Sequence, residues 1–529
     1  MGIYLNPDNR DFKKSRNSRL YVDKSMLIDY LNQVMDTDQQ FVSVSRPRRF
    51  GKSMAANMIS AYYSRGCDSR KVFSGLKIAD SVDFTKNLNQ YNVIHLNMQD
   101  LLTEAGSVEE MLKLLQSYIL FELTEEFPDV RYFDRTKLVR SLKDVYTKTK
   151  VPFVFVIDEW DCVFRIHQKD TKAQKQYLDY LRFLLKDQSY VSLAYMTGIL
   201  PIKKYGEHSA LNMFYEYSMM NASPIEEFTG FTEEEVQELC KEYPMPFDEM
   251  KKWYDGYHVN GLSVYNPKSV VEAIFRKNLS NYWTQTETYG ALKIYIQMNQ
   301  DGLHEKVSEL VAGGDVPVNT AKFQNDMTTF QSADDVLTLM IHLGYLSFDG
   351  KDGVGTCHIP NSEVQQEFMN CVEEGGYEHL IEAVRESEEL LALTWQENEE
   401  EVAKRVEKIH QENSSILQYN NELSLSCAVT LAYYAAKKQY TIVREMPAGK
   451  GFADLVFIPD RESAVPAMVV ELKWNESAQT ALDQIRDQNY PDCLERYHGE
   501  ILLVGISYDK DEKIQKKKHF CKIERVEKN

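Results

Sequence analysis

Two groups of residues in this 529-residue chain have the types and the spacing that chemistry requires. The first group lies in residues 41–53, FVSVSRPRRFGKS, where a β-rich run turns at Pro47 and reaches Gly51-Lys52-Ser53. A helix-compatible segment starts directly afterwards at Met54. Strand, loop, Gly-Lys-Ser and helix form the context of a phosphate-binding loop. The unpaired N–H groups and the dipole at a helix start favour a bound phosphate anion.

Two residues of this loop have defined roles in nucleotide chemistry. Lys52 would reach the β- and γ-phosphates of ATP, and the hydroxyl of Ser53 would ligate Mg²⁺. The loop departs from the pattern G-x-x-x-x-G-K-[ST], because Arg46 occupies the first glycine position. The alternative is a Gly-Lys-Ser that merely caps a helix. The predicted nucleotide-binding residues of this stretch are Arg46, Pro47, Arg48, Arg49, Phe50, Gly51, Lys52, Ser53 and Met54.

The other half of a nucleotide site follows an apolar run at residues 151–157, VPFVFVI. Such a run predicts a strand buried in a parallel sheet, and ligands bind at the carboxyl ends of these strands. There, Asp158 would hold Mg²⁺ and Glu159 would polarise the attacking water. Either acid alone could instead cap the next helix. A further strand at 191–196 ends at Thr197, which would sense the γ-phosphate or be an ordinary strand-end hydroxyl.

Several motifs together resemble the AAA-ATPase-like family, which is common in bacteria and often carries a C-terminal nuclease-superfamily domain. They are RPRRFGKS, VIDEWD, MTGILPIKK, SALNMFYEYSM, FTGFTEEEV and KKWYDGY…YNPKSV. The resemblance covers roughly residues 1–280. Arg46 in place of the first glycine resembles the family's own version of the loop motif. It implies a P-loop NTPase core of the additional-strand type with a parallel sheet, a helical lid near 225–290, and ATP with Mg²⁺ as ligands.

The second chemical group lies in the last hundred residues, where one strand begins at Asp454 and another ends in Glu471-Leu472-Lys473. Glu and Lys two residues apart on a strand point to the same face. Two carboxylates can hold divalent cations that activate water, and a lysine can offset charge on the transition state. The alternatives are a chance Glu-Leu-Lys on a solvated edge, or the fold without the activity.

The order of these residues resembles the PD-(D/E)XK nuclease superfamily. The resemblance implies catalytic Asp454, Glu471 and Lys473, with Mg²⁺ or Mn²⁺ held by Asp454 and Glu471. It also implies supporting roles for Gln484 and Tyr490, while Glu422 on the preceding helix could be a further acidic partner. The sequence departs from the family at residues 451–454, Gly-Phe-Ala-Asp, because a basic residue common before the aspartate is missing.

The chain is too long for one hydrophobic core, so several domains are expected. We predict an α/β protein with a P-loop ATPase core at 1–224, a helical lid at 225–290, a helical and winged-helix-like connector at 291–420, and a restriction-endonuclease-like α/β domain at 421–529. The winged-helix-like part would read nucleic acid or act as a spacer. Its acidic hairpin turn, DGKDGVG, favours the spacer.

Composition narrows the class of protein. The net charge of −19 argues against a surface that coats nucleic acid as a whole, but allows a local basic groove. The eight cysteines show no C-x-x-C pair, which predicts reduced thiols in a cytoplasmic protein. The first residues, MGIYLNPDNRDFKK, lack the apolar segment of a signal peptide, and we expect no membrane partner.

These observations predict an ATP-binding and ATP-hydrolysing protein coupled to a metal-dependent nuclease-like domain that acts on nucleic acid. The expected partners are ATP, nucleic acid and further copies of the chain. The alternative is an ATP-dependent switch or assembly protein whose nuclease-like domain only binds. A third class, a small-molecule phosphotransferase, is favoured neither by the arginine-rich loop nor by the C-terminal domain.

Overall fold

The chain forms two compact units in this computed structural model. The N-terminal unit comprises Met1–Thr286 and Pro317–Gln366, and the C-terminal unit comprises Glu287–Val316 and Glu367–Asn529. The structure describes residues 2–202, 211–283, 288–298, 302–323, 330–373, 378–413, 422–448, 451–460, 463, 465–488, 494, 499–510 and 517–527. The four segments expected from the sequence stay a prediction.

A parallel sheet forms the centre of the N-terminal unit, with the strand order β2-β3-β4-β1-β5. Every residue of β3 and β4 is buried, as their apolar sequences predict. Strand β4 lies between β1 and β3, which is the additional strand that the resemblance implies. The strands are β1 (Phe41–Ser45), β2 (Asn92–Asn97), β3 (Phe153–Asp158), β4 (Val191–Gly198) and β5 (Tyr215–Tyr217).

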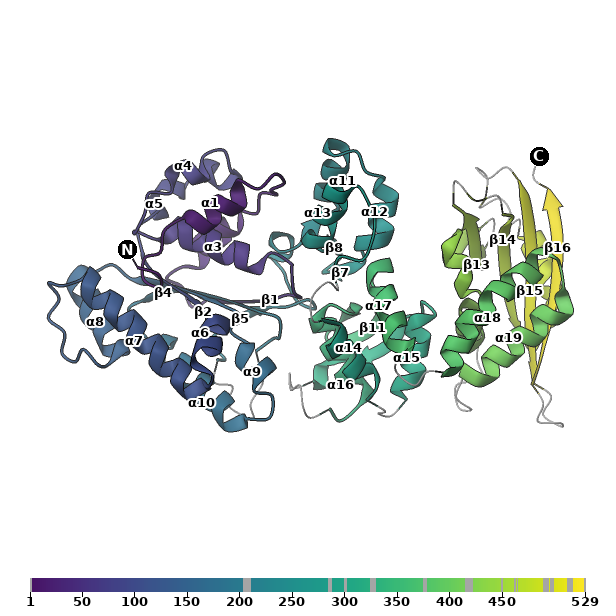
Figure 1. The fold of residues 1–529 in the computed structure, drawn as a ribbon. Coiled ribbons are helices and arrows are strands. Elements are labelled where there is room, and N and C mark those ends of the chain that lie inside the picture. Colours follow the sequence, from purple (N-terminus) through teal and green to yellow (C-terminus); the bar gives the residue numbers. More distant parts are fainter. Residues whose placement is uncertain are drawn as a thin grey trace. The chain divides into compact units, whose positions relative to one another are not determined.

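Helices cover both faces of this sheet (Figure 1). Helix α3 (Lys52–Tyr63) lies on one face together with α1 (Arg10–Arg16), α4 (Arg70–Phe73) and α5 (Phe84–Asn87). The opposite face carries α6 (Met98–Ala105), α7 (Val108–Glu126), α8 (Leu138–Thr149), α9 (Cys162–Ile166) and α10 (Thr171–Leu185). Helix α7 buries Met111, Leu115 and Ile119, whose spacing of four residues places them on one helix face. The predicted α/β core is therefore confirmed.

Among the described residues of the predicted lid, three α-helices lie entirely within its bounds, together with a small sheet that the sequence analysis did not predict. Strands of two to four residues are too short to show a pattern, and their turn is set by Asn260-Gly261, which have φ values of 52° and 80°. The elements are β6 (Phe231–Thr232), α11 (Glu233–Glu242), α12 (Phe247–Tyr254), β7 (Tyr257–Val259), β8 (Leu262–Tyr265) and α13 (Pro267–Arg276), with the sheet order β6-β8-β7.

The expected helix and hairpin of the middle region are present. Helix α16 (Ala333–Leu343) ends at Gly344, whose φ of 84° is the left-handed conformation of a helix C-cap. Strands β10 (Ser347–Lys351) and β11 (Val354–His358) then pair antiparallel around Asp352-Gly353, and β9 (Val316–Asn319) completes a sheet of order β10-β11-β9.

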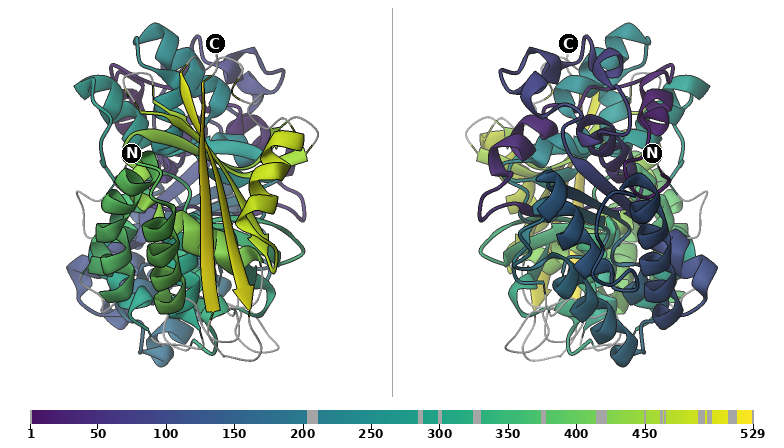
Figure 2. Two further views of the ribbon diagram at one scale, coloured as in Figure 1. Left: turned by 90° about the vertical axis from the view of Figure 1, so that its right-hand side faces the viewer. Right: turned by 90° about the vertical axis from the view of Figure 1, so that its left-hand side faces the viewer.

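A mixed sheet forms the core of the C-terminal unit, with the order β12-β13-β14-β15-β16. Within this sheet, β14 and β15 are the only described pair of strands that runs parallel. Helices α18 and α19 lie on one side of the sheet and α21 on the other (Figure 2, left). The elements are α18 (Glu378–Trp395), α19 (Glu399–Asn413), α20 (Glu422–Ala432), β12 (Tyr440–Ala448), β13 (Gly451–Pro459), β14 (Ala467–Trp474), α21 (Ala478–Asp487), β15 (Glu500–Lys510) and β16 (Lys517–Glu527).

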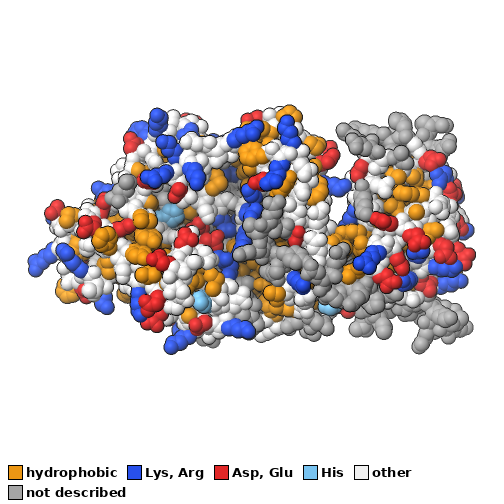
Figure 3. Space-filling view, in the orientation of Figure 1, with side chains coloured by type: hydrophobic (Ala, Val, Ile, Leu, Met, Phe, Trp, Pro, Cys, Tyr) orange, Lys and Arg blue, Asp and Glu red, His pale blue; other side chains and the backbone are white. Residues whose placement is uncertain are grey.

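The remaining helices and the surface complete the description. Helices α2 (Leu27–Val34), α14 (Thr288–Ile296), α15 (Leu303–Val311) and α17 (Ser362–Glu373) are the other α-helices of eight or more residues among those described. Acidic and basic side chains are interspersed over the face drawn in Figure 3. None of the described helices combines the length and the hydrophobicity needed to cross a membrane.

Candidate functional site

The predicted phosphate-binding loop connects β1 to α3. Gly51 precedes the first residue of α3 with a φ of 87°, a conformation that suits glycine, and its carbonyl accepts a hydrogen bond from Ala55 N (3.0 Å). Arg46 N donates to the carbonyl of Gly198 at the end of β4 (3.0 Å), which fixes the start of the loop. Ser53, in the first turn of α3, is exposed.

Lys52 is buried inside this loop. Its Nζ donates to the carbonyl oxygens of Arg46 (2.9 Å) and Pro47 (2.8 Å), which uses two of the three ammonium hydrogens. Burial lowers the pKa of Lys52, while the negative charges of nearby carboxylates oppose this change, those of Glu159 and Asp158 among them. The loop lysine and the acids that follow β3 therefore belong to one electrostatic site.

Asp158 and Thr197 meet at the tips of the neighbouring strands β3 and β4. The buried carboxylate of Asp158 accepts a hydrogen bond at Oδ1 from the hydroxyl of Thr197. The same oxygen accepts the N–H of Glu159 (3.0 Å). Thr197 thus orients the carboxylate that the sequence predicts as a Mg²⁺ ligand.

Glu159 is held by a cation that the sequence analysis missed. Arg165 Nη2 lies 2.5 Å from Glu159 Oε2, and Arg165 Nε lies 3.2 Å from Asp161 Oδ2. Asp161 is fully buried, and its Oδ2 also accepts the N–H groups of Ile199 (3.1 Å) and Leu200 (2.9 Å). Burial raises the pKa of Glu159, and the positive charges of Lys52 and Arg165 oppose that shift. The signal in the sequence was the i, i+4 spacing of Asp161 and Arg165.

Arg46, predicted to bind nucleotide, points into the core. Its guanidinium donates to the carbonyls of Ser45 (2.9 Å) and Tyr217 (3.0 Å), so it joins the end of β1 to β5. Burial lowers the pKa of Arg46 to about 10. This side chain therefore stabilises the start of the loop from within the core.

Other loop residues contact segments far away in the sequence. Arg49 Nη1 donates to the carbonyl of Tyr282 (3.3 Å), and the ring of Phe50 packs edge-on against that of Tyr257, 5.4 Å between centroids. Pro47 lies against Gly344: a Cβ on that glycine would come within 2.7 Å of the proline ring. Arg48 is partly buried and Met54 is exposed.

The second candidate site lies where β13 and β14 meet in the C-terminal unit. Leu455 pairs with Val470 in the antiparallel ladder, so Asp454 and Glu471 are the next residues on each strand. Asp454 Oδ2 accepts the backbone N–H of Leu472 (2.7 Å), which brings the aspartate carboxylate across to β14.

Glu471 is the most buried of the three predicted catalytic residues, with 2% of its surface exposed. Its Oε1 accepts hydrogen bonds from Lys473 Nζ (3.0 Å) and from the side-chain amide of Gln484 on α21. Among the described residues, its Oε2 has no hydrogen-bond partner. Burial, and next the charge of Asp454, raise the pKa of Glu471 to about 7.

This arrangement fits a divalent cation. A buried carboxylate oxygen without a donor, beside a second carboxylate, is the ligand chemistry that Mg²⁺ and Mn²⁺ prefer. Two supporting residues stay predictions: Glu422 begins α20, where its side chain is not described, and Tyr490 lies outside the described residues.

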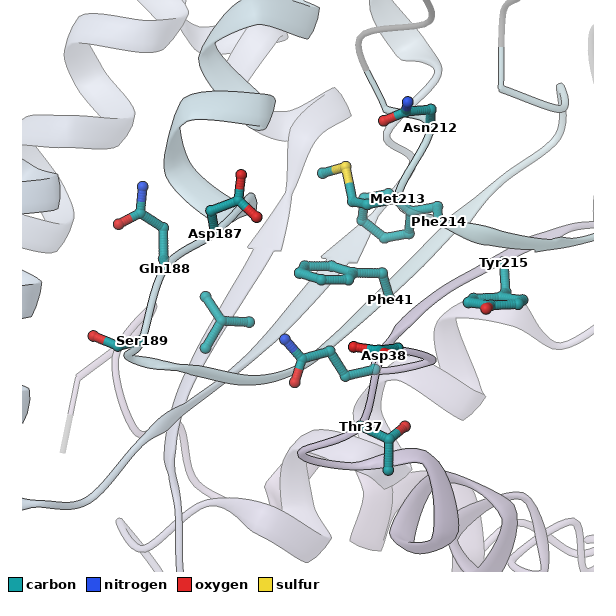
Figure 4. Close-up of a pocket in the computed structure, with 12 residues that line it drawn as sticks. Thr37, Asp38, Phe41, Asp187, Gln188, Ser189, Asn212, Met213, Phe214 and Tyr215 are labelled. Atoms are coloured by element: carbon teal, nitrogen blue, oxygen red, sulfur yellow. The ribbon is translucent and has the colours of Figure 1, made fainter.

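A separate groove of about 730 Å³ opens at the other end of the central sheet (Figure 4). Phe41 and Val191 line it at the starts of β1 and β4, and Asp187, Asn212 and Tyr215 add polar atoms. The Gly-Lys-Ser loop follows the carboxyl end of β1, so this groove is not the nucleotide site.

Two family models match parts of the chain. Residues 9–206 match the family described as "Predicted AAA-ATPase", and residues 422–518 match the PD-(D/E)XK nuclease superfamily. Residues 9–206 are thus similar to the AAA-ATPase-like family and residues 422–518 to the PD-(D/E)XK nuclease superfamily, which confirms the two resemblances inferred from the sequence motifs.

Individual relatives are distant. An uncharacterized protein in the vnfD 5'region of Azotobacter chroococcum mcd 1 is 24% identical over 279 residues, which are 51% of this chain and 51% of that protein. This chain thus spans about half the length of that relative. The structure of the Aeropyrum pernix ORC2 protein in its ADPNP-ADP complexes aligns with 69% of this chain and 98% of that chain, at 12% identity and a TM-score of 0.30. The ADP form of the same protein aligns with 70% of this chain and 99% of that chain, at 9% identity and a TM-score of 0.27. TM-scores of this size do not establish a shared fold.

Proposed function

We propose that the protein hydrolyses ATP at the loop of residues 46–54 and uses this reaction to control a metal-dependent nuclease in its C-terminal unit. One observation carries the proposal: the buried Lys52 of a Gly-Lys-Ser loop shares its electrostatic environment with Asp158 and Glu159 at the tip of β3. Phosphate-binding and water-activating groups are thereby gathered at one end of the sheet.

In the ATPase, each residue has one task. The N–H groups at the start of α3 and the Lys52 ammonium bind the phosphates. Ser53 and Asp158 would hold Mg²⁺, which neutralises the charge that develops on the phosphate oxygens. Glu159, with its raised pKa, orients the attacking water and accepts its proton. Thr197 keeps the Asp158 carboxylate in place.

In the nuclease, Asp454 and Glu471 would hold Mg²⁺ or Mn²⁺, which polarises the scissile phosphate and lowers the pKa of water. The water oxygen attacks phosphorus as the bridging P–O bond breaks, and the products are a phosphate monoester and a hydroxyl group. Lys473 offsets the charge of the transition state, and Gln484 fixes the Glu471 carboxylate.

Phe452 supports nucleic acid as the substrate. It lies two residues before Asp454 on β13, so both side chains leave the strand on the same face. Its ring is 63% exposed, which is a large apolar surface beside two carboxylates. Exposed aromatic rings stack on nucleobases without regard to sequence.

The second candidate function is an ATP-dependent switch or assembly protein whose nuclease-like domain only binds. The stretch Gly451-Phe452-Ala453-Asp454 favours it, because the basic residue that is common before this aspartate in the nuclease superfamily is missing. In this case ATP changes the oligomeric state of the protein without any strand cleavage.

Two assays on the full chain test these functions. We expect Lys52→Ala to lose ATP binding and Glu159→Gln to bind ATP without hydrolysing it, whereas the exposed Lys113→Ala matches wild type. Glu471→Ala and Lys473→Ala should abolish cleavage of labelled DNA and RNA with Mg²⁺ or Mn²⁺, whereas Lys404→Ala should not. Intact substrate with wild-type protein, combined with an ATP-dependent change in sedimentation, would favour the switch.

A further inference from the structure

Three side chains outside both candidate sites converge in the N-terminal unit. His258 on β7, Asp349 on β10 and His358 on β11 each offer one ligand atom, and these atoms all lie within 4.8 Å of one another. His258 Nδ1 lies 3.1 Å from Asp349 Oδ1, and His358 Nδ1 lies 3.4 Å from Asp349 Oδ2. We propose that this His-Asp-His group binds a divalent transition-metal ion of the Zn²⁺ type.

The backbone brings the three residues together through Ser347. In the β10–β11 ladder Ser347 pairs with His358, so Asp349, two residues further along β10, is a diagonal neighbour on the same face. The hydroxyl of Ser347 accepts the N–H of His258 (3.2 Å), which places β7 beside the start of β10. Three strands from two sheets thereby present their side chains to one point.

The donor set selects the class of metal. Imidazole nitrogens bind Zn²⁺, Co²⁺ and related ions, whereas Mg²⁺ and Ca²⁺ prefer oxygen ligands. Two histidines and one carboxylate leave a coordination position for water, as in open zinc sites. The side chains of His258 and Asp349 are 44% and 47% exposed, so water and metal reach the group from solvent.

The negative charge of Asp349, whose two carboxylate oxygens each contact one histidine, favours a cation between the rings. The hydrogen bond to Asp349 raises the pKa of His258, and the same bond lowers the pKa of Asp349. Asp255 adds to the rise at His258, while Lys251 opposes it.

The position of the cluster predicts the mechanical effect of the metal. The ion would cross-link β7 of the lid sheet to the β10–β11 hairpin. Tyr257, the neighbour of His258, packs on Phe50 of the Gly-Lys-Ser loop and donates a hydrogen bond to the carbonyl of Gly344 (2.8 Å). Binding should therefore stabilise the N-terminal unit against thermal unfolding.

The experiment titrates the full chain with Zn²⁺, and with Co²⁺ as a spectroscopic probe, in excess Mg²⁺ and without nucleotide. The variants are His258→Gln, His358→Gln and Asp349→Asn. The matched control is Asp352→Asn, which removes the same charge from the turn of the same hairpin, at a φ of 53° that asparagine adopts readily.

Wild type and Asp352→Asn should bind one Zn²⁺ more than the three variants do, and should show the visible Co²⁺ band of histidine ligation. Loss of a direct ligand should weaken this site by at least the roughly tenfold that loss of an outer partner costs. Zn²⁺ should raise the melting temperature of wild type and control only, while all proteins melt alike without metal. Equal Zn²⁺ binding by all five proteins, or no Co²⁺ band in wild type, would overturn the proposal.

Discussion

At the scale of single residues, buried charge distinguishes the two candidate sites. Lys52 and Asp161 are buried in a network of opposite charges, where each carboxylate or ammonium has a partner. Glu471 pairs with Lys473 through Oε1, but it is also buried next to a like charge, that of Asp454, and its Oε2 lacks a donor among the described residues. Burial, and next the charge of Asp454, raise the pKa of Glu471, so below this pKa a proton competes with a metal ion for the carboxylate.

Metal binding at the C-terminal site should therefore depend on pH. Because the folded-state pKa of Glu471 is raised to about 7, the folded chain holds this proton more tightly than the unfolded chain does. The stability that this bound proton gives to the folded chain is present at low pH and is lost as pH rises toward 7. Mn²⁺ affinity should change in the opposite direction, rising about tenfold per pH unit up to this pKa and then levelling.

Isothermal titration with Mn²⁺ between about pH 5 and pH 8, without nucleotide, measures this dependence. Glu471→Gln is the control, because it has the same shape and no titrating proton, so the pH-dependent part should disappear together with most of the affinity. An affinity for Mn²⁺ that is constant below neutral pH in wild type would contradict competition between a proton and the metal ion at this site.

Local sequence accounts for part of both sites and fails where partners are distant. The sequence predicts a Gly-Lys-Ser loop after β1 and a strand that ends at Asp158, because each feature depends on fewer than about fifteen neighbouring residues. The ion pair between Arg165 and Glu159 was missed, because the i, i+4 spacing of Asp161 and Arg165 does not show that the turn between β3 and α9 also brings Arg165 to Glu159. The His258, Asp349 and His358 cluster was missed for the same reason, since its members are adjacent only across two sheets.

At the scale of elements, one carboxylate ties the segment around Tyr282 to helix α17. Glu363 on α17 is buried and accepts the backbone N–H groups of Tyr282 (2.7 Å) and Trp283 (2.9 Å) and the hydroxyl of Ser269 on α13 (2.8 Å). The carbonyl of Tyr282 in turn accepts a hydrogen bond from Arg49 of the Gly-Lys-Ser loop. Helix α17 thus positions a segment that contacts the loop. No sequence motif marked Glu363, because its donors come from backbone about eighty residues away.

Replacing Glu363 by alanine should loosen this segment. The substitution leaves two buried N–H groups without an acceptor, at a cost of about 1 to 3 kcal/mol for each. We expect much faster hydrogen exchange at the amides of Tyr282 and Trp283 and weaker ATP binding, because Arg49 loses a fixed acceptor. Glu272→Ala on α13 is the matched control, since its partners Lys268 and Arg276 lie at the surface. Unchanged exchange at both amides in Glu363→Ala would contradict this role.

At the scale of the whole molecule, the two candidate sites lie in two different compact units of one chain. The parallel sheet of the N-terminal unit gathers its acids and its loop at the carboxyl ends of β1, β3 and β4. The mixed sheet of the C-terminal unit places its carboxylates where β13 meets β14. If the two sites work together through binding, ATP must change the affinity of the C-terminal unit for nucleic acid. Linkage then requires that nucleic acid change the affinity for ATP by the same factor.

This reciprocity gives a sharp prediction for the Lys473→Ala protein, which should bind nucleic acid without cutting it. A non-hydrolysable ATP analogue should change its affinity for a fluorescent single strand by about 5- to 150-fold, the usual range of such coupling. The single strand should change the affinity for the analogue by the same factor. Adding Lys52→Ala should remove both effects, because the analogue no longer binds, while adding Lys113→Ala should leave them intact. Affinities that stay independent of each other in Lys473→Ala would mean that the ATPase does not act on the C-terminal unit through binding.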